Sequence, residues 1–266
     1  MLKRLSIEWM KLKSYRTFWI LTILYLLCIT GINYIAYYIQ QKIYQAREAK
    51  GMAQMLIGHI PYSYPTVWQM TAYISSYLLF FPGLLMIIIM TNEYSYKTHR
   101  QNIIDGWSRW QFISVKMFQA LLLAIISTIV VILTAILFGT IEGSESFSTD
   151  HFIYIWYYFI QALSYVLAAL LISVLLKRGG LAIGIYFLYV VVVETVLKFV
   201  LNYFFDTAGR YLPLKASSEL IPAPLFERVQ RQFSSPLNYP ALLITSALYL
   251  FAYFYLTMKK FQTDDL

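Results

Sequence analysis

The chain alternates between long apolar runs and shorter polar segments. A helix needs about 20 predominantly apolar residues to cross the hydrocarbon core of a membrane. Runs of that length are predicted at about 18–39, 69–90, 119–138, 152–176, 181–200 and 240–258. The pattern therefore predicts an all-α integral membrane protein, with one transmembrane domain of six helices over residues 1–266.

Composition supports this prediction. Hydrophobic residues make up 59% of the chain and charged residues 13%, whereas soluble domains carry about 25% charged residues. The 24 tyrosines and 6 tryptophans suit a protein with two membrane–water boundaries, where amphipathic rings collect. The single cysteine, Cys28, lies in the first apolar run, which excludes an internal disulfide and a cysteine-based metal site.

The charge distribution predicts how the chain is oriented. The formal net charge is +8, and Lys and Arg collect before the first run, in residues 91–118, at 177–178 and in the C-terminal tail. With six spans these segments share one side, which the positive-inside rule assigns to the cytoplasm. Both termini of this multi-pass cell-membrane protein are then cytoplasmic. The basic charge is expected to face anionic lipid, and no nucleic-acid partner is expected.

The segment before the first run is amphipathic. Its apolar residues recur at spacings of three and four: Leu2, Leu5, Trp9 and Leu12. This spacing predicts that residues 1–17 form an interfacial helix on the cytoplasmic side. A basic flank that only fixes the topology is the alternative. The side chains expected at the membrane interface are Trp9, Lys11, Arg16 and Lys116.

The segment before the last run, residues 201–239, contains four prolines. Between them lie short pieces such as KASSELI and LFERVQRQF, which are too short and too polar to span a membrane. We expect external helices here that lie on the outer interface or re-enter it.

The loop after the second run, TNEYSYKTHRQNIIDGWSRWQFISVK, is longer than a hairpin between two spans requires. The Asp105-Gly106 pair indicates a helix end or a turn. Before it, THRQNII is expected to form a short helix capped by Thr98, and Ser108 is expected to cap the next helix. A snorkelling basic flank would explain Arg109 and Lys116, but it would explain neither the break nor the length.

Two segments resemble the permease subunit of ATP-binding cassette (ABC) transporters of the type-2 exporter class. The matching residues of the N-terminal segment are Glu8, Trp9, Lys11 and Arg16. Those of the loop after the second run are Glu93, Lys97, Thr98, Arg100, Gly106, Ser108, Arg109, Phe112 and Lys116. The prolines and short pieces before the last run also resemble the external re-entrant element of that family.

The resemblance implies a division of labour between subunits. This chain would pair with a second permease and form the substrate path. Residues from about Thr98 to Arg109 would include a coupling helix seated on a cytoplasmic ATPase. The chain has no GxxxxGK[ST] loop, so ATP and Mg²⁺ would bind the partner, and this chain would hold no cofactor and would not be an enzyme. The implied ATPase-coupling residues are Glu93, Thr98, Arg100, Asp105, Gly106, Ser108 and Arg109.

The fifth run is the one that holds ionisable residues, Glu194 and Lys198. Their i, i+4 spacing favours a structural ion pair near the outer interface, and a role in the transport path is the alternative. The three histidines lie in different segments, so no metal site is expected. A secondary transporter, a channel and a non-transporting scaffold remain the rival functions. A peptide, a drug or a lipid-like molecule would fit as exported substrate.

Overall fold

The computed structural model describes residues 2–45, 60–143, 145–224 and 236–264, and all regular secondary structure within them is helical. The helices are α1 (Leu2–Lys13), α2 (Arg16–Gln45), α4 (Val67–Ser76), α5 (Phe80–Ser95), α6 (Thr98–Ile104), α7 (Arg109–Glu142), α8 (Ile153–Leu176), α9 (Gly179–Leu188), the π-helix η1 (Tyr189–Val193), α10 (Glu194–Phe205), the 3₁₀-helix η2 (Ala208–Tyr211), α11 (Lys215–Ser218) and α13 (Tyr239–Thr263).

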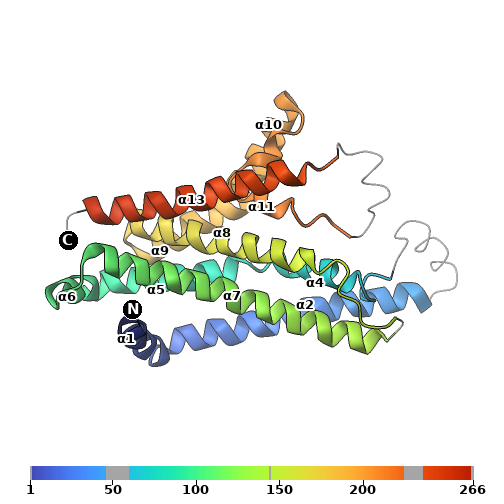
Figure 1. Cartoon of the computed structure of the whole chain (residues 1–266), viewed down its shortest axis with the longest axis horizontal. Coiled ribbons are helices and arrows are strands. Elements are labelled where there is room, and N and C mark those ends of the chain that lie inside the picture. Colours follow the sequence, from blue (N-terminus) through green and yellow to red (C-terminus); the bar gives the residue numbers. More distant parts are fainter. Residues whose placement is uncertain (1, 46–59, 144, 225–235, 265–266) are drawn as a thin grey trace.

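The long helices lie side by side along the long axis of the molecule (Figure 1). Within the described residues, five helices are long and apolar enough to cross a membrane, and the bent pair α4–α5 makes a sixth span if it is counted as one. Each of the six predicted runs falls on one of these helices. The two ends of the chain lie at the same end of the bundle as α6, which we call the α6 end (Figure 1).

Helix α8 forms the centre of the bundle and packs against α4, α5, α7, α9, α11 and α13. Small side chains, such as Ala162 and Ala169, let neighbouring backbones approach it closely. In the most apolar 18-residue window of α8, 61% of the residues are buried, against 17% in the span Gly179–Phe205. The span from α9 to α10 therefore leaves most of its surface uncovered by this chain.

The second span is not the single helix that the apolar run predicted. It bends by 47° between α4 and α5, at a turn formed by residues 77–79. Pro82 has no amide hydrogen, so an uninterrupted helix could not donate to the carbonyl of Leu78. The Phe81 amide donates to that oxygen instead, at 3.0 Å. The bend is thus a direct consequence of a proline four residues after Leu78.

The fifth span also departs from the expected regular helix. It begins at Gly179, passes through the π-turn Tyr189–Val193 and continues to Phe205, so it is longer than the predicted run 181–200. Opposite its first half, Gly83 leaves room for the Tyr186 ring, whose hydroxyl oxygen would lie 2.1 Å from any added Cβ. The span is fixed to α5 by this close approach.

Polar side chains also link the helices. In the first span, Asn33 Nδ2 donates to Ser75 Oγ on α4 at 3.1 Å, and its oxygen accepts from the Tyr62 hydroxyl at 3.0 Å. The segment 212–221, which we call the external element, contains α11 and buries Leu214 and Ile221. It packs between α8 and α13 rather than lying on the surface. The second predicted piece, residues 225–233, lies outside the described residues.

Candidate functional site

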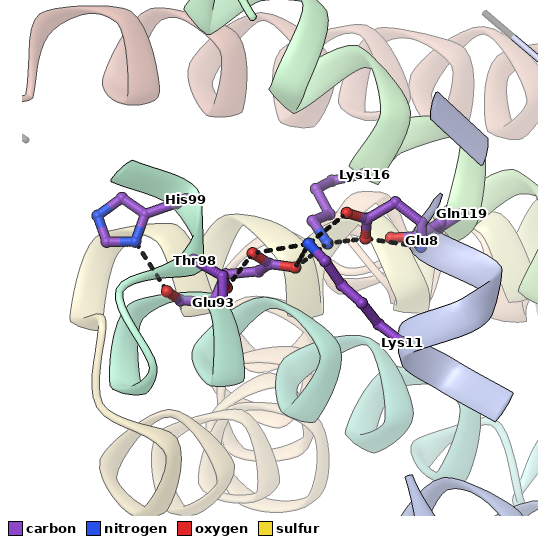
Figure 2. Close-up of polar contacts among 7 residues, drawn as sticks. All are labelled: Glu8, Lys11, Glu93, Thr98, His99, Lys116 and Gln119. Atoms are coloured by element: carbon purple, nitrogen blue, oxygen red, sulfur yellow. Dashed lines mark hydrogen bonds and ion pairs between the residues drawn. The ribbon is translucent and has the colours of Figure 1, made fainter. Parts of the chain in front are cut away.

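Four charged side chains meet at the α6 end of the bundle and form what we call the ion ring: Glu8, Lys11, Glu93 and Lys116. They come from three helices that are far apart in sequence, α1, α5 and α7 (Figure 2). Each lysine contacts both glutamates, so the charges alternate around a closed loop. The ring therefore ties the N-terminal helix to the second and third spans.

The contacts in the ion ring are close. Lys11 Nζ lies 2.8 Å from Glu8 Oε1 and 3.1 Å from Glu93 Oε1. Lys116 Nζ lies 2.8 Å from Glu93 Oε1 and also contacts Glu8 Oε2. Gln119 Nε2 donates to Glu8 Oε2 at 3.2 Å, and the Thr98 hydroxyl donates to Glu93 Oε2. Lys11 Nζ also lies 3.4 Å from Glu93 Oε2, so three of the four carboxylate oxygens accept from two donors, which suits ionised groups.

Burial makes these contacts important for stability. The Lys116 side chain is 1% exposed, and both carboxylates are nearly as deep, whereas Lys11 is 34% exposed. Burial alone would lower the pKa of Lys11, but the hydrogen bonds and the charges of Glu8 and Glu93 raise the pKa above its ordinary value. Lys11 is therefore charged at neutral pH. Removing one partner from such a buried set leaves a charge uncompensated.

Beside the ring, a cavity of about 200 Å³ lies between α1 and α5. Its wall includes Leu12 and Tyr15 from the N-terminal segment and Ile89 and Asn92 from α5. Helix α1 therefore does not pack tightly against α5 along its whole length. The ion ring is a principal attachment of α1 to the bundle.

Helix α6 follows directly from the ring and projects beyond the other helices (Figure 1). Left-handed backbone conformations bound it on both sides, at Lys97 (φ 55) and Gly106 (φ 93). At its end, the Trp107 amide donates to Asn102 O at 3.0 Å, which closes the last turn. Helix α6 is thus a short protrusion with a defined break at each end.

The base and the tip of this protrusion differ in exposure. At the base, the buried His99 ring donates from Nδ1 to the Glu93 carbonyl at 2.8 Å. At the tip, Arg100 and Asp105 are exposed, and Ile104 is 78% exposed. Ile104 is thus the exposed apolar side chain of α6, and it lies next to the charged Asp105.

The start of α7 has the cap that the sequence predicted. Ser108 Oγ accepts from the Gln111 amide at 3.2 Å, and Gln111 Oε1 accepts from the Ser108 amide at 3.1 Å, a complete capping box. Thr98 does not cap α6: the N-cap position is Lys97, and the Thr98 hydroxyl bonds to Glu93. The carboxylate is the stronger acceptor and lies within the reach of Thr98.

Several predicted coupling and interface residues have other surroundings than expected. Glu93 and Thr98 belong to the ion ring and its supports rather than to an exposed face. Lys116 was predicted at the membrane interface, but it is buried in the ring, where two carboxylates replace water around its ammonium group. Trp9 is exposed, as an interfacial residue would be, and so is Arg16.

Arg109 contacts the C-terminal end of α13. Its Nη1 donates to the carbonyls of Gln262 and Asp264, at 2.5 and 2.8 Å. The Asp264 carboxylate forms ion pairs with Lys177 and Lys260, at 2.8 and 2.6 Å. Burial would raise the pKa of Asp264, but these two lysines hold the pKa below its usual value. Arg109 therefore secures the tail, and the exposed part of the predicted coupling set consists of Arg100, Asp105, Gly106 and Ser108.

The expected ion pair between Glu194 and Lys198 is wrong. Lys198 pairs with Glu219 of the external element. Glu194 Oε1 accepts from the Tyr189 hydroxyl and from the Leu214 amide, both at 2.8 Å. These two donors hold the carboxyl group on the buried side of the helix, and Glu219 offers Lys198 a carboxylate closer to the surface.

The ion ring was not predicted as a unit, although a signal was present. Its four members are among the residues that carry the resemblance to type-2 ABC permeases. A family model described as ABC-2 family transporter protein matches residues 4–193 of the chain. The matched range contains the whole ring and α6. No curated protein matches the chain.

Proposed function

This chain belongs to the ABC-2 transporter family, and on that premise we propose that it is the permease subunit of an ATP-driven exporter whose α6 transmits movements of a separate ATPase. In this proposal the α6 end is cytoplasmic, as are both termini. ATP and Mg²⁺ bind the ATPase, and this chain binds no cofactor. The exported substrate would be a peptide, a drug or a lipid-like molecule.

The observation that carries the proposal is the attachment of α6 to the membrane helices. The helix protrudes between two backbone reversals, and the ion ring joins its base to α1, α5 and α7. A force on the tip would therefore move these three helices together instead of bending a loop. Residues Arg100, Ile104, Asp105 and Gly106 would contact the ATPase.

A second permease would complete the substrate path. The span from α9 to α10 leaves most of its residues uncovered, and large apolar side chains such as Phe187 and Phe199 are exposed on it. Lipid or a second permease subunit can cover such a face. We propose that the path lies between two permeases, and either an identical or a related subunit fits this arrangement.

A secondary transporter is the alternative that one observation favours. Such proteins bind ions or substrate near the midplane, often at interrupted helices. The fifth span contains a π-turn next to the buried Glu194, and the second span is broken. This alternative gives no role to the protruding α6, which is why we prefer the ABC permease.

The test is a mild-detergent pull-down of the tagged chain from its native membranes, followed by mass spectrometry and an ATPase assay. We expect a stoichiometric nucleotide-binding subunit. Ile104→Glu should lose this subunit while the chain still inserts and folds. The matched control is Phe147→Glu, another exposed apolar residue, which lies in the loop between α7 and α8. Recovery of a folded wild-type chain without a nucleotide-binding subunit would contradict the proposal.

A further inference from the structure

Glu194 differs from the other buried acids of the bundle in the hydrogen bonds and ion pairs around its carboxyl group. The residue is 1% exposed and follows directly after the π-turn in the fifth span. Among the described residues, no lysine or arginine forms an ion pair with it, and Lys198 is engaged with Glu219. Burying an ionised carboxylate without a partner is strongly unfavourable, because the charge loses its hydration and gains nothing in return. The group therefore needs another source of neutralisation.

The two oxygens of Glu194 have different environments. Oε1 accepts two hydrogen bonds, from Tyr189 and Leu214. Oε2 is buried and has no hydrogen-bond partner in the described part of the chain. An ionised carboxylate carries charge on both oxygens and needs donors on both. A carboxylic acid has one carbonyl oxygen, which accepts, and one hydroxyl, which carries no net charge. An oxygen without a donor therefore costs the acid less than it costs the carboxylate, and the asymmetry at Glu194 favours the acid.

The π-turn creates this arrangement. Tyr189 and Glu194 are five residues apart, which in an α-helix places side chains roughly 140° apart around the axis. In the π-turn the Glu194 amide bonds to the Tyr189 carbonyl, and this i→i+5 closure brings both side chains to the same side. The Tyr189 hydroxyl then reaches Oε1 at 2.8 Å. The helix irregularity thus serves to hold one carboxyl group.

The surrounding groups favour a proton over a metal ion. Tyr165 of α8, Tyr249 and Tyr253 of α13 and Lys215 of α11 lie within reach of the charge of Glu194. Divalent cations such as Ca²⁺ and Mg²⁺ take about six oxygen ligands, and the neighbouring carboxylate, Glu219, is occupied by Lys198. The Tyr253 hydroxyl is also buried without a hydrogen-bond partner among the described residues.

We propose that Glu194 is a proton-binding site, protonated at Oε2 in this arrangement, which releases its proton when the external element moves away from α10. The reaction is the ionisation of the acid to carboxylate, with the proton passing to water on the side of the external element. The seated element supplies the Leu214 donor and excludes water. Once it departs, water takes the place of the Leu214 amide and solvates the carboxylate. The inference rests on this geometry and not on the ATPase partner.

The direct test is infrared difference spectroscopy on the full chain in lipid nanodiscs. At neutral pH, the wild type should show the deuterium-sensitive C=O stretch of a protonated carboxylic acid. This band should be missing in Glu194→Gln, present in the exposed-site control Glu145→Gln, and lost from the wild type as the pH is raised. A difference between wild type and Glu194→Gln that contains only carboxylate bands at neutral pH would overturn the proposal.

Thermal stability gives a second, independent readout. Glutamine imitates a protonated glutamic acid, because its carbonyl can accept the same two hydrogen bonds. Glu194→Gln should therefore keep the wild-type melting temperature at neutral pH, whereas Glu194→Ala should lower it. At alkaline pH the wild type should lose stability and Glu194→Gln should not. A melting temperature that falls in Glu194→Gln at neutral pH would mean that the native group is ionised, and would overturn the proposal.

Discussion

At the α6 end, four charged side chains neutralise one another in a closed ring, whereas Glu194 in the fifth span leaves one carboxyl oxygen without a partner in the described part of the chain. Both sites bury carboxyl groups whose oxygens contact residues from at least two helices or segments. In the ion ring, each charge faces a charge of opposite sign, so the contacts tie the attached helices together. At Glu194, compensation depends on a proton, which can leave. The first arrangement suits force transmission and the second suits a change of state.

The two sites also differ in what holds them in place. The ion ring joins α1, α5 and α7 through side chains alone, across more than a hundred residues of sequence. Glu194 is fastened by a hydroxyl five residues away and by one backbone amide of the external element. A site of the second kind can open locally without unfolding the bundle. Three substitutions, ordered by expected effect, test this distinction.

The largest effect is expected from Lys116→Met, which removes the deepest cation of the ion ring. Two buried carboxylates would lose a partner, and breaking a buried ion pair costs about 3–5 kcal/mol. We expect a sharp fall in folded protein and in the melting temperature in detergent. Lys11→Met should lower the stability less, because Lys11 is 34% exposed and water can solvate the carboxylates in its place.

A double-mutant cycle supplies the control for the ring. Adding Glu8→Gln to Lys116→Met removes one uncompensated charge. The loss of stability in the double variant should therefore be smaller than the sum of the losses in the two single variants. Strictly additive losses would mean that Glu8 and Lys116 act separately. The ring would then not be a unit.

A smaller effect is expected from Tyr189→Phe, which deletes the hydroxyl that donates to Glu194 Oε1. Leaving a buried polar group with one donor fewer costs about 1–3 kcal/mol. We expect a moderate fall in melting temperature, with the Leu214 bond still in place. Tyr186→Phe is the matched control, because its hydroxyl makes only a long contact of 3.4 Å to a carbonyl. Equal losses in both variants would show that the Glu194 contact has no special weight.

The smallest of the three effects is expected from Ser108→Ala, which removes the capping box at the start of α7. Loss of an N-cap side chain typically costs about 1 kcal/mol. The exposed cap lies between α6 and the ring, so the ATPase activity of the complex should change little if the ring carries the coupling. Loss of coupling without loss of stability would show that the junction between α6 and α7, and not the ion ring, transmits the movement.

Hydropathy predicted the helical membrane fold well, because each span is encoded by a continuous run of sequence. The short helix before Asp105-Gly106 and the Ser108 cap were equally accessible, since both depend on neighbouring residues. The bend before Pro82 could have been inferred from that proline. The π-turn could not, because the run YVVVV is apolar throughout and carries no local break signal.

The contacts at the sites were harder to predict than the helices. Glu8, Glu93 and Lys116 lie in three segments that sequence reasoning treats separately, and they meet only because the folded chain places α1 beside α5 and α7. For Glu194, the i, i+4 spacing to Lys198 suggested an ion pair, but a distant acid, Glu219, and a backbone amide of the external element decided the outcome. Long-range competition for polar partners is not visible in local spacing.

The most direct test of the central claim is cross-linking from the tip of α6 in native membranes. Cys28 is the single native cysteine, so a Cys28→Ser background leaves one reactive thiol when Gln101→Cys or Ser146→Cys is added at an exposed position. A thiol-attached photo-cross-linker should join the α6 position to a nucleotide-binding subunit, and the position in the loop between α7 and α8 should not form this adduct. If α6 forms no such adduct, or if both positions form it equally, α6 is not the coupling helix.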